Sequence, residues 1–287
     1  MEKSIDQSQL RISEKFTEDL YSQYIDGNIK FSQIALLCGV YPYQLQKYFK
    51  LNNLKYRQTV LDETTKHNFF DTIDSEIKAY LLGFYLADGS MDFKNRRISL
   101  SVTKSDEYIV DLFRKYISPY YKKTCSKSYT NKKTGYTSKP MVGTCFKSNK
   151  ICEVLTRYGM GANKTYSESI NVGVVPNKFF MHFLRGYFDG DGCVCVTTGK
   201  REIKGKKYTY NNYNWSIISN TNGHLTQIKN KLISAFNIHA NIIEDKRGHF
   251  LLEINKKHDF FKLRDLLYKD SNFALPRKKE KYMAIPC

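Results

Sequence analysis

Two short stretches carry the residue types best suited to chemistry. Residues 81–89 read LLGFYLADG and residues 184–192 read LRGYFDGDG, so each ends in an aspartate followed by glycine, Asp88 and Asp191. Read as helices, both stretches place these acids at C-terminal ends, where the helix dipole is negative and backbone carbonyls lack partners. Two carboxylates and two carbonyl oxygens in one place would form an oxygen-only, negative site of the kind that suits Mg²⁺.

The residues before each acid predict that the two helices pack closely together. Gly83 and Ala87 stand one helical turn apart in the first stretch. Gly186 and Gly190 repeat that spacing in the second. Small residues spaced in this way lie on one helix face and let two backbones approach. The glycine after each acid is expected to adopt the left-handed conformation that often ends a helix. One Asp-Gly pair usually marks only a turn, whereas two matching copies favour a shared site.

The chain repeats one order of elements after each stretch. After the first, the patterns predict a strand, a helix, a basic hairpin and a helix, at 98–103, 105–113, 121–146 and 150–158. After the second, they predict a strand start, a basic and tyrosine-rich turn, a strand, a helix, a hairpin and a helix, at 194–196, 200–213, 215–219, 225–236, 242–254 and 259–267. An internal repeat of this completeness indicates two halves of like fold.

We therefore expect an α+β fold of two αββαββα halves, residues 74–175 and 176–287, related by a pseudo-dyad. The motif helices would lie along the dyad, and each half would offer a curved antiparallel sheet. Together the sheets would form a saddle whose lysines and tyrosines bind a duplex through its phosphates. Residues 50–74 lack strong periodicity and are expected to form a linker.

The composition favours a polyanionic partner. The 287 residues include 46 lysines and arginines against 28 acids, a formal net charge of +18, and the 22 tyrosines are interleaved with the lysines. Such a balance is typical of nucleic-acid binding. An anionic membrane surface is the weaker alternative, because the sequence has no basic amphipathic anchor and no apolar stretch near the ~20 residues of a membrane span.

Cysteine usage and the N-terminus bear on the compartment. The seven cysteines form no CxxC pair, and their odd number argues against a disulfide framework. The six histidines make no zinc-type pattern with them. The polar N-terminus shows no signal peptide. We expect a reducing, intracellular location and no structural zinc site.

Residues 1–65 are expected to form a separate helical domain. Residues 31–37 read as a short helix, 38–40 as a tight turn and 42–50 as a second helix, with Pro42 at its first position. This pattern resembles a helix-turn-helix whose second helix enters the major groove of DNA. The residues expected to face outward toward DNA are Tyr43, Gln44, Gln46 and Lys47. An ordinary helical hairpin that caps the main domain is the alternative.

Residues 74–287 resemble a known family. LLGFYLADG and LRGYFDGDG are similar to the two signature motifs of monomeric LAGLIDADG homing endonucleases. The resemblance implies that Asp88 and Asp191 bind the catalytic metal, Mg²⁺, with Mn²⁺ able to substitute. In that family the backbone carbonyls just before the acids, here Ala87 and Gly190, commonly assist. The resemblance also implies double-stranded DNA as the partner and a monomer with an internal pseudo-dyad.

The same resemblance nominates further residues near the metal. A polar residue at the end of the second strand of each half positions the hydrolytic water in the family, and here that position falls on Lys104 and Asn220. A basic residue that recurs in the family's active sites falls on Lys164 and on Lys278, or on Lys279 one position later. The alternatives are ordinary strand or cap residues for the first pair and phosphate-contacting lysines for the second.

The two motifs differ at one acidic position. The second has Asp189 where the first has Leu86, so we interpret Asp189 as a local structural polar group and not as a ligand. The two water-positioning candidates also differ. These differences predict that the two strand-cutting sites are chemically unequal.

Two functional hypotheses follow. The first is a site-specific double-strand DNA endonuclease, a homing endonuclease, in which divalent metals at the two acids promote hydrolysis and lysines neutralise the developing charge. The alternative is an RNA maturase or a transcription factor that binds nucleic acid on the same fold without cleaving it. A lapsed nuclease has no chemical reason to keep both acids. Their presence therefore favours the enzyme.

Overall fold

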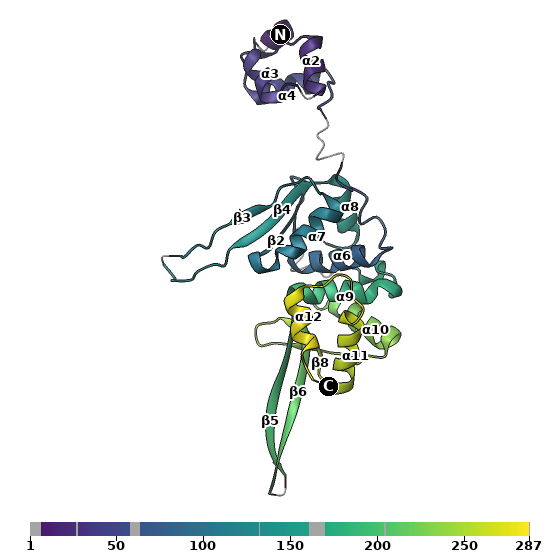
Figure 1. The fold of residues 1–287 in the computed structure, drawn as a ribbon. Helices are drawn as coiled ribbons and strands as arrows, with labels where there is room; N and C mark the ends of the chain where they lie inside the picture. Colours follow the sequence, from purple (N-terminus) through teal and green to yellow (C-terminus); the bar gives the residue numbers. More distant parts are fainter. Residues whose placement is uncertain are drawn as a thin grey trace. The chain divides into compact units, whose positions relative to one another are not determined.

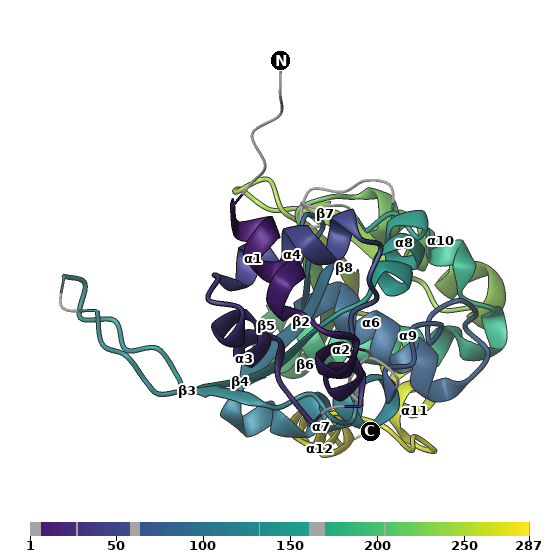
Figure 2. The ribbon, with the colours of Figure 1, turned by 90° about the horizontal axis from the view of Figure 1, so that it is seen from above.

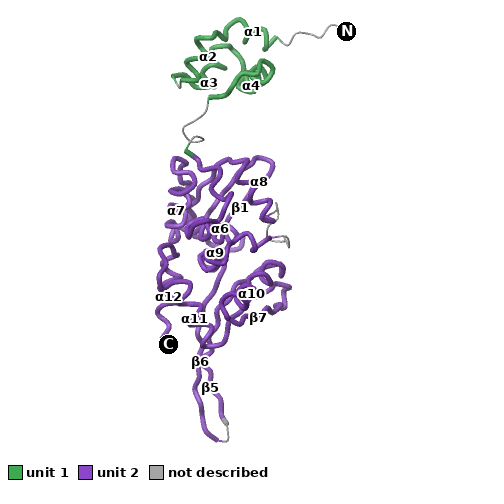
Figure 3. Tube along the Cα trace, turned by 90° about the vertical axis from the view of Figure 1, so that its right-hand side faces the viewer, with its two compact units in different colours: residues 1–64 green, residues 65–287 purple. Residues whose placement is uncertain are grey.

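The computed structural model describes residues 7–26, 28–57, 64–131, 133–160, 170–203 and 205–286. The chain forms two compact units, residues 1–64 and residues 65–287, which are coloured separately in Figure 3. Each unit has its own buried apolar cluster. The two units are therefore described one at a time.

The first unit is a small helical bundle. Its helices are α1 (Gln7–Lys15), α2 (Glu18–Ile25), α3 (Phe31–Leu37) and α4 (Pro42–Leu51). The buried residues that hold it together are Ile12, Tyr24, Ile34, Ala35, Cys38, Leu45 and Phe49. Gly39 has a φ of 65°, a left-handed conformation that suits glycine in the tight turn between α3 and α4. The two predicted helices and the tight turn between them are present in the structure.

The second unit contains the two halves of the repeat. The first half consists of α6 (Glu76–Asp88), β1 (Gly89–Asp92), β2 (Arg97–Thr103), α7 (Glu107–Ile117), β3 (Thr124–Ser126), β4 (Met141–Lys147) and α8 (Asn149–Arg157). The second consists of α9 (Asn177–Asp191), β5 (Gly192–Ile203), β6 (Lys206–Ser219), α10 (Gly223–Phe236), β7 (Asn241–Glu244), β8 (Phe250–Ile254) and α11 (Lys257–Tyr268). A further helix, α12 (Pro276–Met283), follows and was not expected from the sequence.

Each half has one four-stranded antiparallel sheet with the same strand order, β1-β2-β4-β3 in the first half and β5-β6-β8-β7 in the second. Apolar residues alternate along β2, where Ile98, Leu100 and Val102 are buried against the helices. The repeated order confirms the α+β fold with two four-stranded sheets.

The two motif helices, α6 and α9, lie side by side between the two halves (Figure 1). A Cβ added to Gly83 would lie 2.0 Å from the backbone oxygen of Phe183. A Cβ added to Gly186 would lie 2.0 Å from the backbone oxygen of Tyr80. These separations leave no room for a side chain, so the predicted close approach of the helices is confirmed.

The glycines after the two acids have a different role from the one expected. Gly89 has a φ of −71° and Gly192 a φ of −78°, so both are extended and neither is left-handed. A Cβ on Gly89 would lie 2.3 Å from the ring of Tyr85, and one on Gly192 would lie 2.0 Å from the ring of Phe188. Glycine is needed there because an aromatic ring from the preceding turn covers the strand start. The left-handed prediction is wrong.

The expected turn over residues 200–213 is also wrong, because these residues are strands. Strands β5 and β6 pair from Gly192 opposite Ile217 to Ile203 opposite Lys206, and the tight turn is at Gly205, with a φ of 74°. Strand β8 pairs only with the last five residues of β6. The rest of β5 and β6 is thus a two-stranded ribbon that projects beyond the sheet (Figure 1). The residues of this ribbon are mostly exposed and polar, so polar and apolar residues do not alternate along it. That alternation is the pattern that predicts a half-buried strand.

The segment before α6 is not entirely a linker. Phe69, Phe70 and Ile73 are buried in the core of the second unit. Tyr158 donates a hydrogen bond to the backbone oxygen of Phe70 at 2.6 Å. The apolar residues between 69 and 73 form a run too short to show the period of a helix or a strand in the sequence.

Candidate active site

The two motif acids end neighbouring helices. Asp88 is the last residue of α6 and Asp191 the last residue of α9, and both are exposed. A Cβ added to Gly190 would lie 2.3 Å from the Cβ of Ala87 and 3.2 Å from the Oδ2 of Asp88. The last turns of α6 and α9 are therefore in direct contact, and the Asp88 carboxylate lies beside the other helix.

Two hollows flank this contact, and each takes residues from both motifs. The first, here called the Asp88 hollow, has a volume of about 400 Å³, and its lining includes Asp88 together with Gly190. The second, the Asp191 hollow, has a volume of about 220 Å³, and its lining includes Asp191 together with Ala87. Each can hold several water molecules. Each acid is thus paired with the residue that precedes the opposite acid.

The donor chemistry of the hollows fits Mg²⁺. Within the described ranges, no three His, Cys, Asp or Glu side chains form a cluster that could enclose a metal. Mg²⁺ commonly binds proteins through one or two carboxylates, with water and substrate phosphates as its other ligands. One exposed carboxylate in each open hollow suits that manner of binding.

The water-positioning candidates, Lys104 and Asn220, are not placed equivalently. Asn220 lines the Asp191 hollow together with Ser219. Lys104 does not line the Asp88 hollow, and its ammonium pairs with Glu107. Hydrogen bonds from Lys104 and Lys123 lower the pKa of Glu107 to about 2. Lys104 is therefore already engaged in an ion pair on the surface.

The basic candidates also differ in position. Lys164 lies outside the described residues. Lys278 lies on α12, donates a hydrogen bond to the backbone oxygen of Gly192 and sits 5.3 Å from the centre of the Phe188 ring. Burial lowers the pKa of Lys278. Lys279 donates to the Oγ of Ser271 at 3.1 Å. Neither Lys278 nor Lys279 lines either hollow.

The cation of α12 that does line the Asp88 hollow is Arg277, which the sequence reasoning missed. Its Nε and Nη2 donate to the two carboxylate oxygens of Asp106, both at 2.8 Å. Burial raises the pKa of Asp106, but the hydrogen bonds and charge of Arg277 outweigh this and lower it below its ordinary value. Asp106 also lines the hollow. In the sequence, Asp106 appeared only as part of a helix start.

The Asp191 hollow contains a buried polar pair that the sequence reasoning also missed. The Tyr187 hydroxyl and the Nε2 of His224 are joined by a hydrogen bond of 2.9 Å. Burial lowers the pKa of His224 to about 4 and raises that of Tyr187, to which the charge of Asp191 contributes. Both side chains are therefore neutral near pH 7. The signal in the sequence was a tyrosine where the first motif has Phe84.

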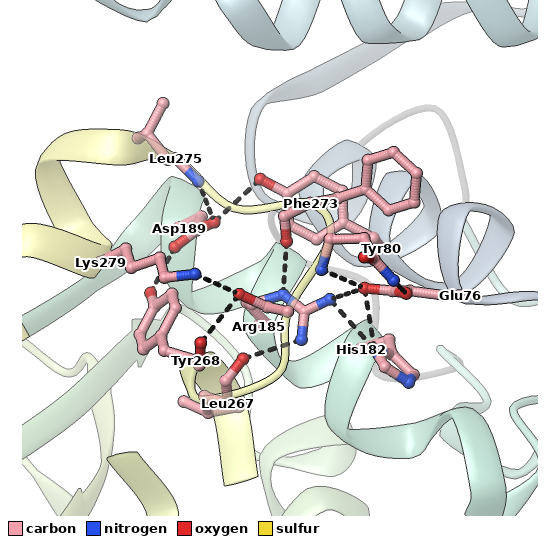
Figure 4. A network of polar contacts seen from close by, with 12 residues as sticks. Glu76, Tyr80, His182, Arg185, Asp189, Leu267, Tyr268, Phe273, Leu275 and Lys279 are labelled. Carbon is pink, nitrogen blue, oxygen red and sulfur yellow. Dashed lines mark hydrogen bonds and ion pairs between the residues drawn. The ribbon is translucent and has the colours of Figure 1, made fainter. Parts of the chain in front are cut away.

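Asp189 is a buried structural group, as its absence from the first motif suggested. It accepts hydrogen bonds from the Tyr80 hydroxyl at 2.8 Å, the Tyr268 hydroxyl at 2.5 Å and the Leu275 backbone N–H at 2.7 Å (Figure 4). Burial raises its pKa to about 6. Asp189 lines neither hollow, and its hydrogen bonds join α9 to α6, to α11 and to the segment that leads to α12.

Arg185 strengthens the same helix interface. Its guanidinium donates to the backbone oxygens of Phe273 at 2.6 Å and Leu267 at 2.8 Å, and to the Glu76 carboxylate of α6 at 2.7 Å (Figure 4). A buried arginine with these partners has its charge balanced and its donors used. These contacts join the middle of α9 to the first residue of α6 and to the chain from Leu267 to Phe273.

In the first unit, three of the four residues expected to face DNA are exposed. Tyr43 is 67% exposed, and its ring stacks on that of Tyr41 with centroids 6.0 Å apart. Gln46 and Lys47 are exposed on the same helix. Gln44 is half-buried, and its Oε1 accepts the backbone N–H of Tyr41 at 2.8 Å, so this side chain caps α4.

Two long hairpins extend the surface of the second unit. Cross-strand pairing places Arg201 opposite Tyr208 and Gly199 opposite Tyr210 on one face of the β5–β6 ribbon. The ring of Tyr210 covers Gly199, where an added Cβ would lie 2.6 Å from it. In the first half, the segment between β3 and β4 projects away from the sheet (Figure 2). Both hairpins present exposed tyrosines and basic residues.

Comparison with known proteins supports the fold. Residues 179–265 match the profile of the LAGLIDADG-like domain. Among solved structures, the homing endonuclease I-WcaI bound to its DNA recognition sequence is similar, with a TM-score of 0.54 and 18% identity over 81% of this chain and 96% of that chain. The second unit therefore has the LAGLIDADG fold.

Two further solved structures match this chain with lower TM-scores. Mesophilic variants of the homing endonuclease I-DmoI give a TM-score of 0.47 and 16% identity over 73% of this chain and 98% of that chain. The N-terminal LAGLIDADG domain of DUF199/WhiA gives a TM-score of 0.39 and 20% identity over 74% of this chain and 93% of that chain. A search of curated proteins finds no match. No helix among the described residues is both long enough and apolar enough to cross a membrane.

Proposed function

We propose that this protein is a site-specific double-strand DNA endonuclease that depends on a divalent cation, Mg²⁺ or, in its place, Mn²⁺. The observation that carries the proposal is that each hollow is lined by residues of both motifs. Asp88 lies with Gly190 in one hollow, and Asp191 lies with Ala87 in the other. The two strands of a duplex are themselves related by a dyad. Two equivalent acids at one helix interface therefore match the need to cut both strands.

The reaction forms a bond between a water oxygen and phosphorus and breaks one bridging P–O bond. One product end is a phosphate and the other a hydroxyl, after the water has lost a proton and the leaving oxygen has gained one. A divalent cation, when bound, supplies charge neutralisation at the phosphate and lowers the pKa of water. Asp88 and Asp191 would hold that cation, with the backbone oxygens of Ala87 and Gly190 beside them.

Other side chains would orient the reactants. Asn220 lines the Asp191 hollow and can hydrogen-bond a water there. Arg277 lines the Asp88 hollow and can donate to a phosphate oxygen, which stabilises charge that develops in the transition state. Lys278 would have to leave the Gly192 carbonyl to reach a phosphate, and Lys104 would have to leave Glu107. Their catalytic roles stay predictions, as does that of Lys164.

The exposed hairpins support DNA as the substrate. A two-stranded β-ribbon fits the major groove of B-form DNA, where the base pairs can be distinguished. Arg201, Tyr208 and Tyr210 lie on one exposed face of the β5–β6 ribbon. Helix α4 of the first unit, with Tyr43, Gln46 and Lys47, would add contacts. The formal charge of +18 supplies the attraction to phosphates.

Substitution of either acid tests the mechanism. Asp88→Asn and Asp191→Asn keep the size of the side chain but remove the negative charge, so each variant should lose double-strand cleavage while its DNA affinity stays within about threefold of the wild type. The measurement is cleavage of a duplex selected from a randomised library with the wild-type protein and Mg²⁺, beside a binding titration on the same duplex. If either variant cuts both strands as fast as the wild type, the proposed mechanism is wrong.

Binding without cutting is the alternative function. A wild-type protein that retains RNA containing an intron, promotes its splicing and cuts no DNA in the selected library with Mg²⁺ or Mn²⁺ would act as a maturase. A protein that binds one DNA sequence and cuts nothing would act as a transcription factor. Either outcome would overturn the endonuclease proposal.

A further inference from the structure

We propose that His249, oriented by Asp245, accepts the proton of the attacking water in the Asp191 hollow. This inference rests on the proposed endonuclease function and adds a side-chain proton acceptor to it. Two observations support it: the His249 side chain lines the hollow, and its Nδ1 is hydrogen-bonded to a carboxylate.

Strand pairing brings His249 close to Asn220. The last pair between β6 and β8 is Ser219 opposite Phe250. Because the strands are antiparallel, the next residues beyond this pair are Asn220 on one side and His249 on the other. Both line the hollow together with Asp191. A water in the hollow can therefore meet an amide and an imidazole at the same sheet end.

The turn between β7 and β8 holds His249 in place. The backbone N–H of Asp245 donates to the backbone oxygen of His249 at 2.8 Å, and Gly248 closes the turn with a φ of 80°. The Oδ1 of Asp245 accepts the backbone N–H groups of Arg247 at 2.8 Å and of His249 at 2.9 Å. Its Oδ2 lies 3.3 Å from the Nδ1 of His249. The two carboxylate oxygens thus have separate tasks, one in the turn and one at the ring.

This pairing sets the tautomer of His249. An ionised carboxylate can only accept hydrogen bonds, so Nδ1 must carry the hydrogen and Nε2 of the neutral ring has the lone pair. Hydrogen bonds, above all the one from the backbone N–H of His249, lower the pKa of Asp245, so its carboxylate is ionised near pH 7. A carboxylate beside the ring also stabilises the imidazolium that forms when Nε2 takes a proton.

The other histidine of the hollow is less suited to this role. The Nε2 of His224 is hydrogen-bonded to the Tyr187 hydroxyl at 2.9 Å, and its Nδ1 lies 3.4 Å from the Thr221 hydroxyl. Burial lowers the pKa of His224 to about 4, which makes it a weak base. The His249 side chain is 35% exposed, so it can pass a proton on to solvent.

The step balances in atoms and electrons. As the water oxygen forms its bond to phosphorus, one proton of the water passes to Nε2 and the ring becomes an imidazolium. The bridging P–O bond breaks and leaves its electron pair on the leaving oxygen, which takes a proton from solvent. The imidazolium then returns its proton to solvent, and Asp245 stays ionised throughout.

The first half has a different residue at the corresponding place. There, Pro140 stands opposite Lys104, and its backbone oxygen accepts the backbone N–H of Lys104 at 2.9 Å. A proline side chain cannot take a proton from water. Substitution of His249 should therefore affect the cutting of one strand only.

Cutting by His249→Gln at several pH values tests the inference. The substrate is the duplex selected with the wild-type protein, labelled with a different dye at the 5′ end of each strand, and the reaction is a single turnover with Mg²⁺. Glutamine can hydrogen-bond a water but cannot take its proton, so cutting of one strand should slow by about a hundredfold. The DNA affinity should stay within about threefold of the wild type.

The pH profile separates a proton acceptor from a structural residue. Only the neutral ring accepts a proton, so the wild-type rate for that strand should rise and level off between about pH 5 and pH 8, where histidines titrate. His249→Gln should lose this inflection. The other titratable and charged groups around His249 belong to its own turn, to β7 and to the lining of the hollow: Asp245, Lys246, Arg247, Glu244, Asp191, Tyr187 and His224. Burial places His224 below this pH range and Tyr187 above it.

Asp245→Asn tests the orientation of the ring. Asparagine keeps an oxygen for the two backbone N–H groups of the turn but places an amide NH₂ opposite Nδ1 of His249. Nδ1 would then accept, the hydrogen would move to Nε2, and no lone pair would remain there for the water's proton. We expect the same strand to slow by at least about tenfold.

A second histidine–aspartate pair in the same half provides the matched control. The Nδ1 of His258 lies 3.1 Å from the Oδ1 of Asp259, and the His258 side chain is 81% exposed and lines neither hollow. His258→Gln should leave the cutting of both strands and the pH profile unchanged. Thermal unfolding of each variant shows whether it is folded.

Three outcomes would overturn the inference. They are unchanged cutting by His249→Gln, an equal slowing of both strands, and a slower rate that keeps the wild-type pH inflection. A wild-type protein that cuts no DNA would instead reject the endonuclease function itself, and this inference with it.

Discussion

His224 shows how burial sets the chemistry of a single residue. The ring is enclosed between α9 and α10, it bonds Tyr187, and burial lowers its pKa to about 4. A histidine that stays neutral down to this pH can orient a hydroxyl or a water but carries no charge to the phosphate. His224 therefore contributes hydrogen bonding and not charge to the Asp191 hollow.

The low pKa of His224 predicts a dependence of stability on pH. Between its unfolded value near 6.5 and its folded value of about 4, the unfolded chain binds more protons than the folded protein. The contribution of this residue to stability is thus complete above pH 6.5 and is lost as the pH falls towards 4. The loss is on the order of 3 kcal/mol.

The measurement is the free energy of unfolding of the wild type minus that of His224→Gln, from denaturant titrations at several pH values between 4 and 7. The difference should shrink as the pH falls, because only the wild type carries this titrating group. Asn230→Ala, at an exposed position of α10 without a titrating side chain, serves as the control and should give a constant difference. A difference for His224→Gln that does not vary with pH would contradict the prediction.

The pair of helices α6 and α9 is the element on which the site depends. Their glycines let the backbones touch, Asp189 and Arg185 fasten them to the segment before α12, and their last turns place the acids beside each other. The same interface carries both the stability of the second unit and the geometry of the hollows. A change in helix separation should therefore affect folding and cutting together.

Gly186→Ala tests this dependence. The added methyl group would lie 2.0 Å from the backbone oxygen of Tyr80, and neither backbone can yield without moving its helix. We expect a loss of about 2 kcal/mol or more in the free energy of unfolding. Asn230→Ala, at an exposed position of α10, is the control and should be neutral or slightly stabilising. An unchanged melting temperature for Gly186→Ala would show that the helices are not in backbone contact.

At the scale of the whole molecule, each of the two units has exposed basic and aromatic side chains that the proposed function assigns to DNA binding. The second unit has the hollows and the projecting hairpins, and the first has α4 with its exposed Tyr43, Gln46 and Lys47. Joining two binding surfaces by a chain segment raises the effective concentration of the second once the first has bound. The first unit should therefore lengthen the DNA footprint and increase the affinity.

The double substitution Gln46→Ala with Lys47→Ala tests the role of the first unit. Footprinting on the selected duplex should show protection lost at one end only, with the central protection intact. Affinity should fall, and the slope of its logarithm against the logarithm of salt concentration should decrease by about one, because one phosphate contact is lost. Lys15→Ala, an exposed cation outside α4, should leave the footprint unchanged. An unaltered footprint in the double variant would exclude α4 as a DNA-binding element.

Features that depend on local residue patterns and on the internal repeat could be predicted before the structure was known. Small residues one turn apart predicted the helix contact, and the position of each acid before a glycine predicted carboxylates at the C-terminal ends of helices. Comparison of the two copies predicted the order of strands and the structural role of Asp189. These inferences held because helical periodicity and strand alternation are properties of neighbouring residues.

The side chains that complete the two hollows could be identified only from contacts between distant parts of the chain. Arg277 reaches Asp106 across 171 positions of the chain, while Lys278, the next residue of α12, turns to the Gly192 carbonyl. One step along a helix changes the direction of a side chain by about 100°. Because helix α12 was not predicted, the sequence could not show which of its basic residues faces the Asp88 hollow. The β5–β6 ribbon was not predicted because its strands are held together by cross-strand pairing and bury no face, so the sequence shows no apolar alternation there.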